Sequence, residues 1–391
     1  MLNRIVAYLR SPRRALLTAG AAVGLGGLVT AVSLTSCQPG VPAPEPAPVL
    51  AHHPLRLEDV PVVRVRLTAA PTRRVELETT GACDVFAGDR RVAQSDAALD
   101  PTPVTRQGET WHLGPIAVRG PHVELRPRHG ARVRLDGTGY RGRLRLVPRG
   151  TDRLLAVNHV DMESYLAGVL PRELYPHWQL EAYRAQAVAA RTFALYHAIT
   201  APPAADYDLG AGQGAQVYGG ADAETDRSWQ AVRQTHGLVL TVGAPGSERV
   251  FMAQYSSCCG GRVNAATAIR DAADIEPLRG GQHDEHCAAC PRYRWGDVSV
   301  PRNQVHEALL SRWPDQARRL GGVRAVRVTR RGTGRWIAQV EIVGVSDEAT
   351  MRIRGQDLRL VLLRHAPDAA KLYSVNCDIR TEGNDIVFAD G

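Results

Sequence analysis

An alanine-rich run follows Trp178 and limits the folds that this chain can adopt. Six alanines lie between Ala182 and Ala194. At about 100° per residue, the polar residues of the run share an arc of about 100°, and apolar residues fill most of the remainder. These polar residues are Glu181, Arg184, Arg191 and Thr192. The sequence therefore predicts a largely buried helix, against which neighbouring backbones pack closely.

Gln186 lies on the apolar side of this helix, at roughly 140° from Glu181 and beside Ala190 and Phe193. A buried amide needs hydrogen-bond partners. Two interpretations stay open, because the amide can hold a neighbouring loop or bind a ligand.

Glu173 precedes the helix, in a segment bounded by Pro171 and Pro176. The prolines predict a loop between a short helix and the alanine-rich one. A carboxylate acts as an acid near neutral pH only when its surroundings keep it protonated. The apolar neighbours expected to bury it are Leu174, Tyr175 and Trp178. A solvated loop glutamate without a catalytic role is the alternative.

Motifs on both sides of this segment are similar to those of one family of bacterial cell-wall proteins. They are Tyr140-Arg-Gly-Arg-Leu, Asn158-x-Val-x-Met-Glu-x-Tyr-Leu-x-Gly-Val-x-Pro-x-Glu173, Leu180-Glu-Ala-x-x-Ala-Gln-Ala-Val-Ala-Ala-Arg-Thr192, Gln216-Val-Tyr-Gly-Gly220, Ala231-Val-x-x-Thr-x-Gly237, Tyr255-Ser-Ser-Cys-Cys-Gly-Gly261 and Cys290-Pro-x-Tyr-x-Trp295. Together they resemble the signature of the SpoIID/LytB family over roughly residues 60 to 391.

The resemblance implies an activity and a site. Family members include lytic transglycosylases, which cleave peptidoglycan glycan strands, and proteins described as amidase enhancers. The catalytic acid of the family is the glutamate of its Pro-x-Glu motif, which is Glu173 here. Matching positions with donors suited to sugar hydroxyl and acetamido groups are expected to bind substrate, although each can equally be structural. They are Gln186, Arg191, Gln216, Tyr218, Tyr255, Ser256 and Ser257.

One departure from the family pattern bears on activity. Family members usually continue past a strand like Asp385–Gly391 into a segment containing His-Gly-x-Gly, whereas this sequence stops at Gly391. Two functions therefore stay open. The favoured one is a lytic transglycosylase that cleaves between N-acetylmuramic acid and N-acetylglucosamine. The other is a non-catalytic peptidoglycan-binding protein that recruits or enhances an amidase.

Cysteines and histidines form a second informative group. Cys258 and Cys259 lie before Gly260, and Cys287-Ala-Ala-Cys290 follows two histidines, His283 and His286. Such density is typical of a structural zinc site, and the expected ligands are Cys259, His283, Cys287 and Cys290. Disulfides between the two segments are the alternative, which an exported chain favours. Cys83 and Cys377 lie outside this group of cysteines in the sequence.

The N-terminus has the pattern of an export signal. Four arginines precede an uncharged stretch from Ala15 to Ser36, which ends in Leu34-Thr-Ser-Cys37. Residues 1–37 are thus expected to be a lipoprotein signal with Cys37 as the lipidated residue, and Arg13-Arg14 also fits twin-arginine export. An uncleaved membrane anchor is the alternative. The proline-rich residues 38–58 are expected to tether an exported, membrane-anchored protein that faces the cell wall or periplasm.

Charge and patterning complete the expectations. The formal net charge is +8, but no clustered basic helix supports nucleic acid as a partner. Alternating runs predict a β-rich lobe over 59–150, followed by a mixed core over 151–391. Strands are expected at 323–330, 336–343 and 372–377, and a helix at 306–313. The fold class is α+β, built around the buried alanine-rich helix.

Overall fold

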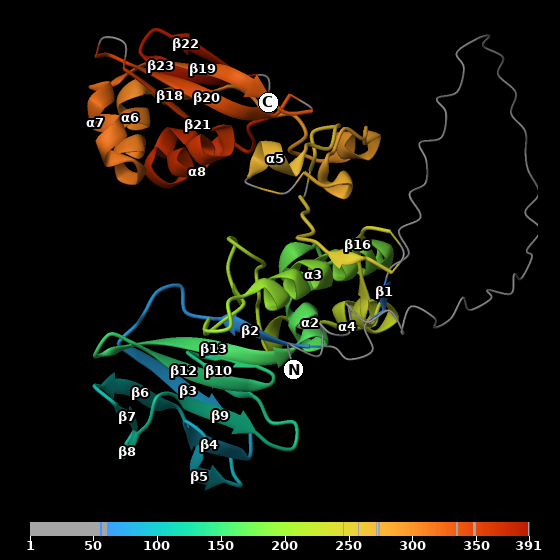
Figure 1. Ribbon diagram of the computed structural model, residues 1–391, viewed down its shortest axis with the longest axis vertical. Helices are drawn as coiled ribbons and strands as arrows, with labels where there is room; N and C mark the ends of the chain where they lie inside the picture. Colours follow the sequence, from blue (N-terminus) through green and yellow to red (C-terminus); the bar gives the residue numbers. More distant parts are fainter. Residues whose placement is uncertain are drawn as a thin grey trace, which may run out of the picture. The chain divides into compact units, whose positions relative to one another are not determined.

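The computed structural model describes residues 55–56 and 61–391, except 245, 257, 271, 273, 334, 347–348 and 390. The chain divides into two compact units, Met1–Ala253 and Gln254–Gly391. Figure 1 shows that strands dominate the first part of the chain and that helices and strands alternate later, which confirms the α+β class. The signal, Cys37 and nearly all of the tether lie outside the described residues. Among the helices that the structure does describe, none is both long and apolar enough to cross a membrane.

Two sheets, antiparallel except where β14 pairs with β2, and three helices make up most of the first unit. The seven-stranded sheet has the order β14-β2-β13-β12-β9-β4-β5, and the six-stranded sheet has the order β11-β10-β3-β6-β7-β8. The strands are β2 (Val62–Arg66), β3 (Arg74–Thr79), β4 (Cys83–Ala87), β5 (Arg90–Ser95), β6 (Thr102–Gln107), β7 (Thr110–Leu113), β8 (Ile116–Arg119), β9 (Val123–Pro127), β10 (Val133–Leu135), β11 (Thr138–Tyr140), β12 (Arg143–Arg149), β13 (Arg153–Asp161) and β14 (Leu209–Gly210).

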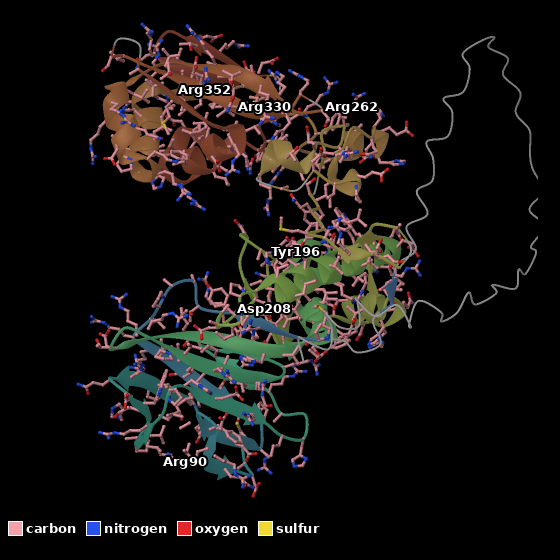
Figure 2. All side chains as sticks on the ribbon, viewed as in Figure 1. Arg90, Tyr196, Asp208, Arg262, Arg330 and Arg352 are labelled. Atoms are coloured by element: carbon pink, nitrogen blue, oxygen red, sulfur yellow. The ribbon has the colours of Figure 1, made fainter. Side chains whose placement is uncertain are left out.

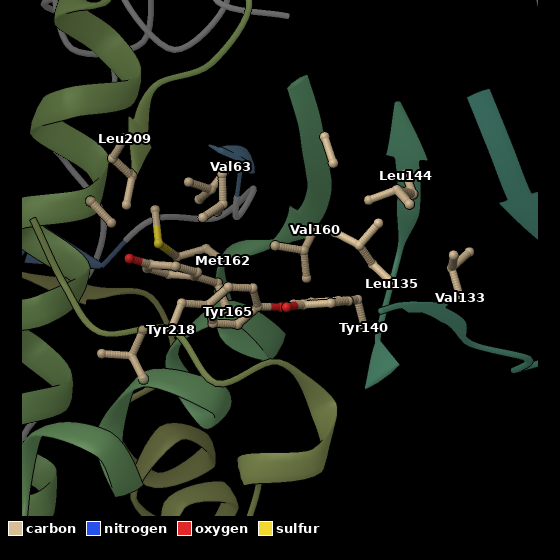
Figure 3. Packing of buried hydrophobic residues seen from close by; sticks show 14 of the residues in the cluster. Val63, Val133, Leu135, Tyr140, Leu144, Val160, Met162, Tyr165, Leu209 and Tyr218 are labelled. Carbon is tan, nitrogen blue, oxygen red and sulfur yellow. The ribbon is translucent and has the colours of Figure 1, made fainter. Parts of the chain in front are cut away.

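The helices of the first unit follow β13. They are α2 (Met162–Glu173), α3 (Leu180–Thr200) and α4 (Asp226–Gln234), with a 3-10 turn η1 (Ala221–Ala223) between the last two. Short strand pairs complete the unit: β1 (Leu55–Arg56) with β15 (Leu238–Val239), and β16 (Thr241–Val242) with β17 (Arg249–Val250). One apolar core takes residues from both large sheets and all three helices. Figure 3 shows part of it, where Tyr140, Tyr165 and Tyr218 meet.

The second unit has its own core between sheets and helices. Its sheets have the orders β18-β23-β22 and β19-β20-β21. The elements are α5 (Ala266–Ile269), η2 (Glu276–Leu278), η3 (Glu285–Ala289), β18 (Val298–Pro301), α6 (Arg302–Arg312), α7 (Pro314–Leu320), β19 (Val323–Arg331), β20 (Ile337–Gly344), β21 (Thr350–Arg354), α8 (Gly355–His365), η4 (Pro367–Lys371), β22 (Asp378–Glu382) and β23 (Asp385–Ala389). In Figure 1, α6, α7 and α8 lie together on one side of these strands.

Three local expectations differ from the structure. The segment 372–377, expected as a strand, is irregular, and its buried Leu372, Val375 and Cys377 only imitate strand alternation while packing into the second core. The strand β13 was not expected, because its seven interior residues are all buried and therefore do not alternate with polar ones. It extends the sheets of the N-terminal lobe past residue 150, to Asp161.

The prediction for the segment around Glu173 also needs correction. Glu173 is the last residue of α2 and not part of a loop, and Pro171 lies inside that helix. The backbone N–H of Leu174 donates to the carbonyl of Leu170 and closes the last turn. A proline removes one backbone donor, and here it does so only two residues before the helix ends.

Candidate active site

The helix that carries Glu173 starts directly at the end of β13. Asp161 caps it, since its Oδ1 accepts a hydrogen bond of 2.9 Å from the backbone N–H of Ser164. All nine residues from Met162 to Leu170 are buried. The position of Glu173 is therefore fixed by a sheet at one end of α2 and by core packing along its length.

A buried ion pair joins α2 to the alanine-rich helix α3. Arg191 donates to both carboxylate oxygens of Glu163, from Nε over 2.9 Å and from Nη2 over 2.6 Å. It also donates from Nη1 to the carbonyl of Leu238 over 3.0 Å. The arginine is fully buried, and Glu163 is 7% exposed. Arg191 was expected to bind substrate, but in this structure its guanidinium holds α2, α3 and β15 together.

The segment Gln216–Gly220 runs along α2 and binds to it residue by residue. The hydroxyl of Tyr165 donates to Oε1 of Gln216 over 2.9 Å, and Nε2 of Gln216 donates to the carbonyl of Ala190 over 3.3 Å. The backbone N–H of Gly219 donates to the carbonyl of Gly168 over 3.1 Å. This approach is so close that a Cβ on Gly168 would lie 2.6 Å from the carbonyl oxygen of Gly220. The glycine is therefore required for packing.

Tyr218 fixes the same segment from its other side. Its hydroxyl donates to Oδ1 of Asn158 over 3.0 Å, and the Asn158 amide donates in turn to the backbone carbonyls of Arg141 and Arg143. The Tyr218 ring packs against Tyr140 and Tyr165, as Figure 3 shows. Burial raises the pKa of Tyr218 well above its usual value. Gln216 and Tyr218 are both buried, so they position the segment and do not face solvent.

This docked segment supplies a hydrogen bond to the candidate acid. The backbone N–H of Val217, between the two anchored residues, donates to Oε1 of Glu173 over 2.7 Å. Glu173 is half-buried. Among the described residues, no donor is placed on its other oxygen, Oε2. The backbone of the docked segment thus holds one carboxylate oxygen of Glu173 in place.

Aromatic side chains gather in the turn that follows Glu173. The ring of Tyr175 lies 5.6 Å from that of Trp178 and 5.7 Å from that of His177. Tyr175 is 61% exposed, whereas Trp178 packs partly against the core. Arg227 holds the turn by donating to the carbonyl of Pro176 over 2.8 Å. Tyr175 therefore does not bury Glu173 as expected, but it offers an apolar surface beside it.

The remaining residues expected to bind substrate have different positions. Gln186 is half-buried on α3, and its Nε2 is buried with no partner among the described residues. Tyr255 and Ser256 are exposed and belong to the second unit. Ser257 lies outside the described residues. Sequence analysis missed Val217, and its only signal is that it stands between two motif residues.

Cysteines of the second unit do come together. The Sγ atoms of Cys259 and Cys287 lie 3.1 Å apart, and Oδ2 of Asp284 lies 3.3 Å from Cys287 and 3.6 Å from Cys259. These three ligand atoms all lie within 4.8 Å of one another. Burial raises the pKa of Cys259 to about 12. Asp284 is a residue that sequence analysis missed, although it stands between the two histidines.

The remaining cysteines and His283 differ in how close they lie to this cluster. Cys258 lies close to Cys290 and Cys287, and burial raises its pKa to about 11. His283 is exposed and is not part of the three-ligand group, so Asp284 takes the place in which a histidine was expected. Cys83 and Cys377 are buried in separate cores, one in each unit.

Comparisons with known proteins agree with this geometry. Residues 150–242, which include α2, α3 and the Gln216–Gly220 segment, match the SpoIID family model, described as Stage II sporulation protein. An uncharacterised protein of Brachyspira hyodysenteriae is 34% identical over 155 residues, which are 40% of this chain and 40% of that protein.

A second relative is the amidase enhancer of Bacillus subtilis. It is 33% identical over 162 residues, which are 40% of this chain and 21% of that protein. The chain thus spans less than half of the length of either relative. The family match, the named relative and the motif positions agree, and they support membership of the SpoIID/LytB family for the region around residues 150–242.

Proposed function

We propose that this protein is an exported lipoprotein that cleaves peptidoglycan glycan strands as a lytic transglycosylase, with Glu173 as the single acid and base. The observation that supports it most is the carboxylate at the end of α2, with Oε1 held by the N–H of Val217. Most glycoside hydrolases need two carboxylates. A transglycosylase needs one, because the sugar supplies the nucleophile.

The reaction has two proton transfers at one carboxyl group. Glu173 first donates its proton to the glycosidic oxygen as the bond from that oxygen to C1 of N-acetylmuramic acid breaks. The 6-hydroxyl of the same sugar then attacks C1, and Glu173 takes the proton of that hydroxyl. The products are a 1,6-anhydro end and a free 4-hydroxyl on N-acetylglucosamine, and no water is consumed. Tyr175 and Trp178 would stack on a sugar ring beside the acid.

The test is incubation of the full chain, in detergent, with purified glycan strands. Wild type should release 1,6-anhydro products that mass spectrometry detects, and Glu173→Gln should release none. Glu181→Gln is a matched control, because Glu181 is an exposed glutamate on the next helix. Equal release by wild type and Glu173→Gln would remove Glu173 from the mechanism.

The second candidate function is enhancement of an amidase. It is favoured by the name of the Bacillus subtilis relative, whose sequence this chain matches over 21% of its length. If wild type releases no anhydro products but raises the rate at which an added amidase cleaves peptidoglycan, the protein is an enhancer and not an enzyme.

We also propose that the cysteine cluster binds a structural zinc ion. Thiolate sulfur with one carboxylate suits zinc, and Cys259, Cys287 and Asp284 would hold it, with Cys290 or Cys258 as the fourth ligand. Metal analysis should find about one zinc ion per chain, and Cys287→Ser should lose it. Absence of zinc together with absence of titratable thiols would instead assign the cluster to disulfides.

A further inference from the structure

At β12, the seven-stranded sheet has one face in the core and one face away from it. On β12, Leu144 and Leu146 are buried in the first core, so the alternate residues Arg143 and Arg145 point to the opposite face. The register extends this face across the neighbouring strands, β9 and β13. We call five residues on it the outer cluster: Glu124, Arg126, Arg143, Arg145 and His159.

Positive charge exceeds negative charge within the outer cluster. Glu124 is its one carboxylate and is fully buried. It lies 2.5 Å from Nε of Arg126, 2.7 Å from Nη2 of Arg145 and 3.4 Å from Nη1 of Arg143. Although burial opposes ionisation of Glu124, the three arginines lower its pKa. Three cations against one anion leave an excess of two positive charges.

Three other arginines on the same sheet, Arg64, Arg66 and Arg149, have a carboxylate or hydroxyl partner of their own. Arg64 binds Asp208, a residue labelled in Figure 2, over 2.6 Å. Arg149 binds Asp206 over 2.6 Å, and Tyr207 between them accepts a hydrogen bond from Arg66. Lys371 is the only lysine of the chain, so the abundance of arginine carries no information by itself. The informative feature is that three arginines of the outer cluster share the single buried carboxylate of Glu124.

The guanidinium groups of the outer cluster keep unused donors and fixed positions. Their side chains are 41% exposed at Arg143, 37% at Arg126 and 30% at Arg145. Within the described part of the chain, Arg126 donates from Nε, Arg143 from Nη1 and Arg145 from Nε, all to Glu124, and Nη2 of Arg145 lies 2.7 Å from the same carboxylate. Arg126 stacks on Phe86, 3.9 Å from the ring centroid. His159 is 6% exposed, and its Nε2 has no partner among the described residues.

We propose that the outer cluster binds carboxylate groups of peptidoglycan stem peptides. The inference rests on the proposed function, because it takes the glycan strand as the substrate. Arginine forks bind carboxylates through paired hydrogen bonds, and a sheet holds them rigidly. The helix α2 has 12 residues and joins β13 to Glu173, which places the acid roughly 18 Å from the end of that strand. The sheet would thus hold the peptides of a strand that Glu173 cleaves.

The test measures binding of the full chain in detergent to two forms of peptidoglycan, with stem peptides intact and with stem peptides removed by an amidase. Wild type should bind the intact form more tightly. Arg143→Gln and Arg126→Gln should each weaken that binding by about three- to tenfold and leave binding to the peptide-free form unchanged. Arg149→Gln is the matched control, since Arg149 lies on the same strand and face but is paired with Asp206.

Two results would overturn the assignment: equal affinity of wild type for both forms, or the same loss with Arg149→Gln as with Arg143→Gln. Stronger competition by a phosphodiester wall polymer than by free stem peptides would also overturn it. Cleavage of peptide-free strands is measured in parallel. If that cleavage fails while the binding differences remain, the enzymatic proposal fails and the carboxylate site stands.

Discussion

The surroundings of Glu173 and the cysteine segment of the second unit hold their chemistry in different ways. Around Glu173, motif side chains are buried and bonded to one another, and the candidate acid receives its hydrogen bond from a backbone N–H. In the cysteine segment, His283 and His286 are exposed, and Cys287 lies in the short 3-10 turn η3. Buried motif residues in the first region thus hold the segments around the candidate acid, whereas in the second region the candidate ligands, two thiols, contact each other directly.

The largest expected effect tests whether Arg191 is a support. Arg191→Met leaves Glu163 buried without its partner, and such losses destabilise a protein by about 3–5 kcal/mol. Chemical denaturation should show this loss in the full chain. Arg184→Met is the control, because Arg184 forms an exposed pair with Glu181 and should cost below about 0.5 kcal/mol. A large loss of activity with unchanged stability would instead make Arg191 a substrate ligand.

A second change removes only the backbone donor to Glu173. Val217→Pro lacks the N–H that binds Oε1, and loss of a hydrogen bond to a charged group costs about 1.5–3 kcal/mol. Turnover of glycan strands should fall by about 10- to 100-fold, with a smaller change in KM. Val217→Ala keeps the N–H and should retain turnover. Equal turnover of Val217→Pro and wild type would contradict a positioning role for this segment.

The smallest expected effect concerns pH. Burial and the charges of Arg145 and Arg143 lower the pKa of His159 from 6.5 to about 3. Below pH 6.5 the imidazole of His159 is therefore protonated in the unfolded chain but stays neutral in the folded chain. The free energy of unfolding falls as pH falls from about 6.5 toward about 3. At pH 5 the loss amounts to at most about 2 kcal/mol.

Denaturation curves at pH 7.5 and pH 5 measure this loss of unfolding free energy. His159→Asn should lose less stability between the two pH values than wild type does, because the residue no longer titrates. His283→Asn, at an exposed histidine of the second unit, should behave like wild type. The same pH dependence in all three proteins would show that His159 is not the group responsible.

Sequence patterns predicted the elements more reliably than the contacts. The buried alanine-rich helix and the fold class are confirmed, because periodicity and small side chains report directly on burial. Alternation failed at β13, which is buried on both faces, and at 372–377, which is buried without being a strand. Both failures have one cause, since alternation reports exposure and not hydrogen bonding.

The candidate site is held together by contacts between residues that are far apart in the sequence. Such contacts cannot be read from a single sequence. Nothing local to Arg191 shows that Glu163, 28 positions earlier, takes its guanidinium. Likewise Val217 has an ordinary apolar side chain, and its backbone matters only because Gln216 and Tyr218 dock the segment on α2. The catalytic role of Glu173 itself stays a prediction.

Cleavage of glycan strands in water enriched in oxygen-18 tests that role most directly. A transglycosylase closes the 1,6-anhydro ring with the sugar's own hydroxyl, so wild type should release anhydro ends without the heavy isotope, and Glu173→Gln should release none. Reducing ends that carry oxygen-18 would show that water is the nucleophile and would contradict single-carboxylate transglycosylation by Glu173.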